Sequence, residues 1–151
     1  MIAVDTNLLV YSVRSDSPWH LAARETIRGL AEGMQPWAIA WSCIHEFVGI
    51  VTHPRIYKPP TPLNDALLQV EYWLESPSLR MLGEVDGYFE TFRAIASIGK
   101  VAGPVVHDAR VAAVCAAAGV QEIWTCDRDY GRFPRIRARN PLPTPTGMAR
   151  T

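Results

Sequence analysis

Short apolar runs with the length of β-strands alternate along this chain with longer segments that show helical periodicity. The strand-like runs lie at residues 2–4, 37–41, 79–82 and 122–126, and a short fifth run lies near Ile136. Strands separated by helices favour a parallel sheet, because each parallel connection has to cross back over the sheet. The alternation therefore predicts an α/β protein with a mainly parallel central sheet covered by helices.

Three polar residues stand where helices are expected to begin. Serine and aspartate side chains accept hydrogen bonds from the free N–H groups of a first helical turn. On this basis Ser17, Ser42 and Asp86 are each expected to cap a helix. Two further helices are expected, from Thr61-Pro62 to Leu74 and from about Asp108 to Gly119.

The length of 151 residues is typical of one domain that buries its core without disulfide bonds. Residues 1–140 are predicted to form this domain, and residues 141–151 a Pro/Thr-rich tail with little to bury. The three cysteines lie in apolar runs without Cys-x-x-Cys spacing, so reduced thiols and a cytoplasmic location are expected. Neither a signal peptide nor a membrane-spanning run is evident.

Four acidic residues stand beside short apolar segments, namely Asp5, Glu46, Asp108 and Asp127. Each has an ordinary explanation, as a turn residue or as an acid favoured by a helix dipole. If the four converge, their carboxylates repel one another, and a hard divalent cation such as Mg²⁺ or Mn²⁺ relieves the repulsion. Convergence therefore predicts that at least one of them has a raised pKa. Removing one charge, as in Asp5→Asn, is expected to leave the metal-free fold intact or slightly more stable.

The motifs around these acids resemble those of PIN-domain ribonucleases, notably the VapC toxins of bacterial type II toxin–antitoxin pairs. The opening IAVDTNLLVY matches a strand, Asp-Thr-Asn and a helix start. The segment VVHDARVAAVCAAAGVQEIWTCDRDYGRFPRI matches an Asp at the head of a small-residue helix, then a strand, then Thr-x-Asp-x-Asp-aromatic. The resemblance covers roughly residues 1–140 and implies a three-layer α/β/α fold.

The same resemblance implies catalytic and metal-binding roles for Asp5, Glu46, Asp108 and Asp127. Asp129 is implied either as a further metal ligand or as a residue that steadies the last loop. Thr6 and Asn7 are implied as supporting groups that hydrogen-bond the site or its water. Tyr130 stands where the family more often has Phe, which we interpret as a change in packing alone.

The implied function is a Mg²⁺- or Mn²⁺-dependent endoribonuclease, the toxin of a VapBC-type pair. RNA is then the substrate, a cognate antitoxin the protein partner and a homodimer the assembly. One alternative is a non-toxin PIN nuclease that acts in RNA processing. Another is a PIN-like RNA-binding or interaction module without catalytic activity, and the presence of all four acids argues against this second alternative. A receiver-type phosphotransfer domain needs a lysine after a late strand, and neither Lys58 nor Lys100 follows one.

Arginines gather near the fourth and fifth strand-like runs, although the net charge of the chain is zero. The overall field therefore does not attract nucleic acid, and binding has to come from a local patch. One hypothesis is that some of these arginines hold RNA phosphates by bidentate contacts, and the alternative is a solvated basic loop. The candidates are Arg128, Arg132 and Arg135, followed by Arg137 and Arg139.

Overall fold

A computed structural model describes residues 1–144 and contains one five-stranded sheet in which every strand pair is parallel. The strands are β1 (Ile2–Val4), β2 (Trp37–Ala40), β3 (Leu79–Leu82), β4 (Glu122–Trp124) and β5 (Arg137–Arg139). The helices are α1 (Thr6–Val13), α2 (His20–Glu32), α3 (Trp41–Val51), α4 (Leu63–Leu74), α5 (Tyr88–Gly99), α6 (Val105–Ala117) and the 3₁₀ helix η1 (Arg128–Arg132). The predicted α/β fold with a parallel sheet is confirmed.

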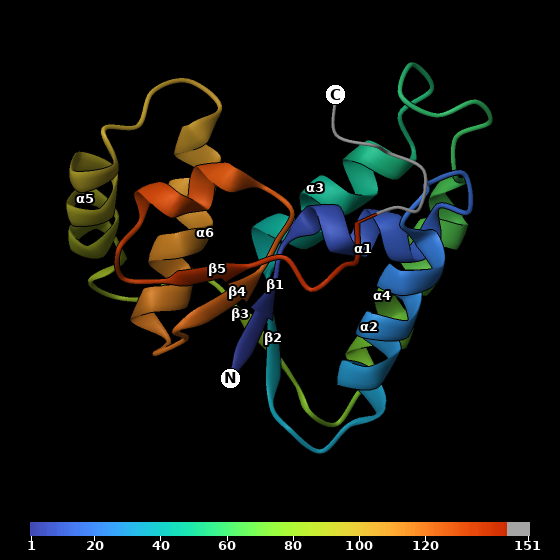
Figure 1. Ribbon diagram of the computed structural model, residues 1–151, viewed down its shortest axis with the longest axis horizontal. Helices are drawn as coiled ribbons and strands as arrows, with labels where there is room; N and C mark the ends of the chain where they lie inside the picture. The colour runs from blue at the N-terminus through green and yellow to red at the C-terminus, as the bar shows by residue number, and fades with distance from the viewer. Residues whose placement is uncertain (145–151) are drawn as a thin grey trace.

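The strand order β3-β2-β1-β4-β5 explains why helices cover both faces of the sheet. The chain moves outward from β1 through β2 to β3, and then returns to place β4 on the other side of β1. Because parallel crossovers are right-handed, connections that run in opposite directions put their helices on opposite faces. Figure 1 shows α1 to α4 on one side and α5 with α6 on the other, which is the expected three-layer arrangement. The change of direction falls between β1 and β4, where ligand crevices form in such sheets.

The core explains the composition of the interior strand β2 and of α6. All four residues of β2 are buried, as expected for a strand covered on both faces. Helix α6 lies against both α5 and β2, and Ala109, Ala112 and Ala113 on it are fully buried. Small side chains let this helix approach its neighbours closely without leaving voids.

The three cap predictions are wrong. Helix α2 begins after Ser17, and the Ser17 hydroxyl instead accepts the N–H of Trp19 in the preceding turn at 3.2 Å. Helix α3 begins before Ser42, directly at the end of β2, so the strand end sets the start of this helix. The buried Ser42 hydroxyl has no hydrogen-bond partner in the described residues. Asp86 precedes the cap position of α5, which Gly87 occupies with a left-handed φ of +83°.

The described part of the predicted tail contributes to the core. Leu142 is 7% exposed, and its N–H donates to Asn140 Oδ1 at 3.0 Å. The rest of the tail, residues 145–151, lies outside the described residues, and the division at residue 140 stays a prediction. Within residues 1–144 no helix is both long and apolar enough to cross a membrane.

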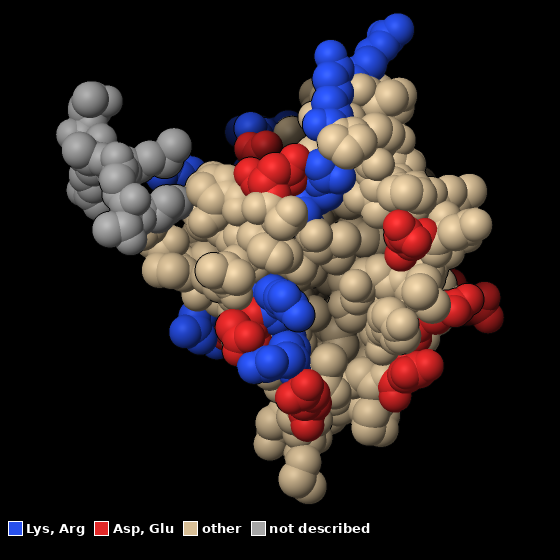
Figure 2. Space-filling model, turned by 90° about the vertical axis from the view of Figure 1, so that its right-hand side faces the viewer, with Lys and Arg blue, Asp and Glu red and all other residues tan. Residues whose placement is uncertain are grey.

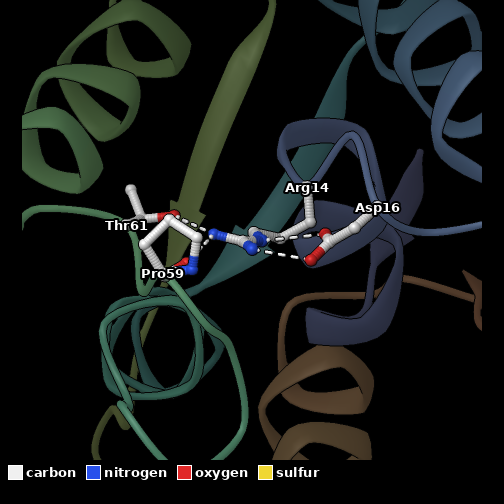
Figure 3. A network of polar contacts seen from close by, with 4 residues as sticks. All are labelled: Arg14, Asp16, Pro59 and Thr61. Atoms are coloured by element: carbon white, nitrogen blue, oxygen red, sulfur yellow. Dashed lines mark hydrogen bonds and ion pairs between the residues drawn. The ribbon is translucent and has the colours of Figure 1, made fainter.

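Arg14, at the end of α1, fastens the loop between α3 and α4 (Figure 3). Its Nη1 donates to Pro59 O at 3.0 Å and to Thr61 Oγ1 at 3.2 Å. Its Nε and Nη2 donate to the two Asp16 carboxylate oxygens at 3.0 and 2.7 Å, and its guanidinium lies 4.2 Å from the centre of the Tyr57 ring. One planar, five-donor group thus joins two segments that are distant in sequence.

Arg14→Ala is expected to loosen this loop without unfolding the domain. The N–H groups of Tyr57 and Thr61 donate to His53 O and Val51 O, so their hydrogen exchange reports loop opening. We expect exchange at these two amides to accelerate at least about tenfold, with little change in melting temperature. Arg14→Lys keeps the charge but loses the planar fork, so it should be intermediate. Unchanged hydrogen exchange in Arg14→Ala would show that the loop keeps its conformation without the contacts of Arg14.

Candidate active site

Asp5 joins β1 to α1 without an intervening loop. Its N–H donates to Trp124 O at 3.0 Å, which extends the pairing of β1 with β4 by one residue. Its side chain is 7% exposed and caps α1, because Oδ1 accepts the N–H of Thr6 at 2.9 Å. The strand end and the cap together hold this carboxylate at the edge where β1 and β4 finish, and the helix start implied by the resemblance is present.

Four nitrogen and oxygen donors converge on the Asp5 carboxylate, and the Cys43 thiol adds a long contact from Sγ to Oδ1 at 3.9 Å. Oδ1 accepts from Thr6 N at 2.9 Å and from the Tyr130 hydroxyl at 3.2 Å. Oδ2 accepts from the Thr125 hydroxyl at 2.7 Å and from Asn7 Nδ2 at 3.3 Å. Burial raises the pKa of Asp5, and the hydrogen bonds from Thr125, Thr6 and Tyr130 oppose that rise by favouring the charged form. A carboxylate has about four lone-pair positions, so these donors use its capacity.

Thr125 is a site residue that the sequence analysis did not single out. Its hydroxyl oxygen accepts from Asp127 N at 3.0 Å and from Asn7 Nδ2 at 3.1 Å. Since both partners are donors, the single hydroxyl proton of Thr125 is directed to Asp5. Asn7 Oδ1 accepts the N–H of Cys126 at 3.2 Å, which fixes the orientation of the Asn7 amide. The only signal in the sequence was the threonine of the Thr-x-Asp-x-Asp motif.

Asp108, Asp127 and Asp129 form a compact group of oxygen donors. One carboxylate oxygen of each lies within 4.8 Å of the others, and all three residues are partly buried. Asp108 lies in the first turn of α6, whereas Asp127 caps η1 through Oδ1, which accepts the N–H of Asp129 at 2.8 Å. Hard oxygen donors at this spacing fit a divalent cation of the Mg²⁺, Mn²⁺ or Ca²⁺ class.

Electrostatic repulsion links this group to the other two predicted acids. Burial and, after it, the negative charges of Asp127, Asp5, Asp129 and Glu46 together raise the pKa of Asp108 to about 7. A position in a first helical turn alone would lower this pKa, so burial and the neighbouring acids together outweigh the helix dipole. The prediction of at least one raised pKa is therefore confirmed.

Glu46 lies on α3, on a more open part of the site. It is exposed as a residue, yet burial of its carboxyl group and then the charge of Asp5 raise its pKa, while Thr6 and His107 lower it. The structure thus brings three of the predicted acids within shared coordination distance, and it couples Asp5 and Glu46 to them through charge.

The raised pKa of Asp108 predicts that the metal-free protein loses stability as the pH rises from about 4 to about 7. In this window the folded state holds a proton on Asp108 that the unfolded state has released, so raising the pH favours unfolding. Above about 7 this contribution is constant. Melting temperatures of the wild type and Asp108→Asn over pH 4–8 isolate the effect as their difference. A difference that does not change with pH would contradict the assignment.

The arginine cluster is divided between ion pairs and free positions. Arg137 and Arg139 on β5 lie against Glu122, with Arg137 Nε 3.0 Å and Arg139 Nη1 3.9 Å from its carboxylate oxygens. Arg132 Nε lies 3.7 Å from Asp129. Arg128 and Arg135 make no ion pair within residues 1–144. A hollow of about 440 Å³ beside Asp127 is lined by residues that include Asp127, Arg128 and Arg139.

Known proteins resemble this chain in both sequence and structure. The family model of the PIN domain matches residues 2–137. A VapC ribonuclease of Mycobacterium bovis, Mb2897, is 33% identical over 143 residues, which cover 94% of this chain and 96% of the relative. Ribonuclease VapC48 of Mycobacterium tuberculosis is 29% identical over 138 residues, which cover 91% of this chain and 95% of the relative.

A solved structure shares the fold at lower identity. The crystal structure of VapBC2 from Rickettsia felis, bound to a promoter DNA fragment, superimposes with a TM-score of 0.66 at 15% identity. The match covers 93% of this chain and 98% of the other. A receiver-type domain is thereby excluded. Because the PIN model spans nearly the whole chain and a VapC ribonuclease is a third identical to it over almost its full length, this chain belongs to the PIN-domain family, among its VapC ribonucleases.

Proposed function

We propose that this protein is a Mg²⁺- or Mn²⁺-dependent endoribonuclease and the toxin of a VapBC-type pair, acting in the cytoplasm. The observation that carries the proposal is the group formed by Asp108, Asp127 and Asp129, whose oxygens lie within 4.8 Å of one another. The relatives named VapC ribonucleases support the reaction type. The three cysteines are free thiols, in keeping with a reducing compartment.

We assign the roles of the acids from the carboxylate lone pairs that are not already used in hydrogen bonds and from the exposure of each side chain. Asp108, Asp127 and Asp129 would hold the cation between them. When bound, a divalent cation supplies charge relief to the scissile phosphate and lowers the pKa of water. Glu46 is the most open acid, so we assign it to orienting the attacking water or accepting its proton.

Asp5 requires a different description, because its four lone-pair positions are occupied by donors. A direct bond from Asp5 to the cation has to displace one of them. The longest of the four hydrogen bonds, from Asn7 Nδ2 at 3.3 Å, is the one displaced at least cost. Thr6 keeps Oδ1 in place through its backbone N–H. Asn7 and Thr6 are therefore proposed as the supporting residues.

Cleavage of RNA tests the proposed function directly. Purified protein is incubated with total RNA in the presence of Mg²⁺, of Mn²⁺ or of a chelator, alongside Asp108→Asn. Discrete fragments are expected with either metal for the wild type alone. Cleavage that persists in chelator, or that is equal in the variant, would refute the proposal.

Arg128 is the arginine that we propose to contact RNA phosphate, because it lines the hollow beside Asp127 and has no ion-pair partner in the described chain. Arg128→Glu is expected to weaken RNA binding and to reduce the slope of log affinity against log salt by about 0.7, the value for one phosphate contact on a single strand. Arg80→Glu on β3, at the opposite edge of the sheet, is the matched control. Fluorescence anisotropy with a labelled RNA measures the affinity of both variants. Equal salt slopes for the two variants would show that Arg128 is a solvated loop residue that does not contact RNA phosphate. Arg132 and Arg135 are the next candidates.

A groove between α2 and α4 supports the proposed antitoxin partner. It has a volume of about 230 Å³, and residues from both helices line it, including Ile27, Tyr72 and Trp73. Figure 2 shows a broad uncharged area on this side of the molecule. Exposed apolar side chains continue along α4, namely Leu63, Leu67, Leu68, Tyr72 and Leu74. An amphipathic helix with spaced apolar residues fits such a surface.

The assembly is proposed from the family resemblance and from a second apolar surface. Phe89 and Ile98 on α5 are 57% and 56% exposed, on the other side of the sheet from α4. A homodimer formed there would leave the α2–α4 groove open to the antitoxin. Light scattering of Phe89→Glu against the wild type tests the assembly. Copurification with the product of a small open reading frame, if one lies beside the gene, tests the pairing.

A further inference from the structure

Tyr130 is a fully buried aromatic residue whose hydroxyl is not needed for packing. It lies in η1, and its ring meets Phe133 edge-on, with ring centres 5.8 Å apart and planes at 85°. A phenylalanine at this position would occupy the same space and make the same ring contact. The hydroxyl therefore requires a separate explanation.

That explanation lies in the partner of the hydroxyl. The Tyr130 O–H donates to Asp5 Oδ1 at 3.2 Å, across 125 positions of the sequence. Burial, and after it the charge of Asp5, raises the pKa of Tyr130 well above its usual value, so the phenol keeps its proton and remains a donor at neutral pH. The only other nitrogen or oxygen donor to this Asp5 oxygen in the described chain is Thr6 N.

The hydrogen bond also connects two parts of the site. Asp5 stands at the end of β1, whereas Tyr130 follows Asp127 and Asp129 in the loop after β4. Asp127 and Asp129 are tied to each other by a local hydrogen bond of 2.8 Å. Tyr130 therefore links the turn that carries two of the clustered acids to the strand end that carries Asp5.

We propose that Tyr130 is a positioning residue of the acidic site, whose hydroxyl orients the Asp5 carboxylate and holds the Asp127–Asp129 turn at the distance that suits a divalent cation. This inference rests on the proposed function in that the cation serves RNA cleavage. Hydrogen-bonded partners of metal-site carboxylates commonly change metal affinity about 10- to 100-fold when they are removed.

Tyr130→Phe tests the proposal with the loss of one oxygen atom. Isothermal titration calorimetry with Mn²⁺ as the probe is expected to show about tenfold weaker binding than in the wild type. In RNA cleavage kcat is expected to fall at a fixed, limiting Mn²⁺ concentration, whereas KM for RNA is expected to stay unchanged because Tyr130 is buried and cannot touch RNA. Equal Mn²⁺ affinity in variant and wild type would overturn the proposal.

Tyr88→Phe is the matched control. Tyr88 lies on α5, stacks on Phe92, and its hydroxyl makes no hydrogen bond within the described residues. This variant removes the same atom outside the acidic site, so Mn²⁺ affinity and kcat should match the wild type. An equal loss in both tyrosine variants would also overturn the proposal.

The calorimetric readout separates this inference from the proposed function. A wild type that binds Mn²⁺ but cleaves no RNA would refute the ribonuclease while leaving the Tyr130 comparison valid. A wild type that binds no Mn²⁺ would overturn both.

A second measurement tests the proposal even if Tyr130→Phe folds poorly. The destabilisation caused by Tyr130→Phe is measured by urea unfolding in the wild-type and Asp5→Asn backgrounds. It should be smaller in the Asp5→Asn background, because a hydrogen bond to a neutral amide is weaker than one to a carboxylate. Equal destabilisation in the two backgrounds would mean that the hydroxyl does not act through Asp5.

Discussion

Asp108→Asn is expected to reduce metal-dependent RNA cleavage at least about 100-fold and, at the same time, to make the metal-free protein more stable at pH 8. The loss of cleavage follows because the variant removes one of the three clustered oxygen donors proposed to hold the cation. The gain in stability follows because a charged Asp108 is partly buried and faces four other acids, and burial together with this repulsion raises its pKa to about 7. Asparagine removes the repulsion at similar volume.

The stability gain should be modest, because the side chain of Asp108 is only partly buried and solvent screens its charge. We expect about 1 kcal/mol, which corresponds to roughly 2–4 °C in melting temperature for a domain of this size. Calorimetry in chelator measures it. Millimolar Mg²⁺ should raise the melting temperature of the wild type and leave the variant unchanged, because only the wild type gains binding energy.

Asp65→Asn is a matched control, because Asp65 occupies the first turn of α4 as Asp108 occupies the first turn of α6. Asp65 is exposed and outside the acidic site, so it benefits from the helix dipole without repulsion. The control should therefore lose slight stability and keep full cleavage. A lower melting temperature for Asp108→Asn in chelator would mean that repulsion does not govern this site.

Asp5→Asn is expected to abolish cleavage to a similar extent, but with the opposite effect on stability. Only one oxygen of an amide accepts hydrogen bonds, whereas the two oxygens of Asp5 accept four from nitrogen and oxygen donors. The backbone N–H of Thr6 cannot turn away, so the amide oxygen takes the Oδ1 position and the NH₂ group faces the hydroxyl of Thr125. That hydroxyl already accepts from two other donors, so it has no free lone pair for the NH₂ group.

Charge alone predicts that Asp5→Asn leaves the stability of the metal-free fold unchanged or slightly raised. The hydrogen bonds to Asp5 reverse this expectation. Leaving buried donors unpaired costs about 1–3 kcal/mol, and relief of repulsion offsets part of this. Urea unfolding of Asp5→Asn and Asp108→Asn in chelator should therefore shift in opposite directions. A stabilised Asp5→Asn would show that the donors around Asp5 rearrange at little cost.

The sequence predicted elements well where burial alone decides them. β2 was placed by an apolar run flanked by turns and occurs where expected apart from Trp41, which begins α3, because a strand covered on both faces has to be apolar throughout. β3 also occurs where expected, although this edge strand carries the exposed Arg80. Helix starts were predicted poorly. Ser42 has the chemistry of a cap, but the end of β2 starts α3 one residue earlier. A local preference of about 1 kcal/mol does not override a junction set by the sheet.

The candidate acids could be named from the sequence because carboxylates at strand ends and helix starts are visible as a pattern. The separate roles of these acids could not be predicted from the sequence. Asp129 was the least specified of the five, yet it shares the compact group with Asp108 and Asp127. Asp5 was expected to be an ordinary ligand, yet it accepts hydrogen bonds from four nitrogen and oxygen donors, one of them a tyrosine interpreted as packing.

By itself, the sequence determined the parallel α/β architecture, the set of acids and the family, because periodicity, apolar runs and ordered motifs are properties of the chain read in one dimension. Only the tertiary structure decided which oxygens face one another and which donors each carboxylate receives. Those facts depend on contacts across β1, α6 and the turn after β4, and no local pattern encodes a distance between residues more than a hundred positions apart.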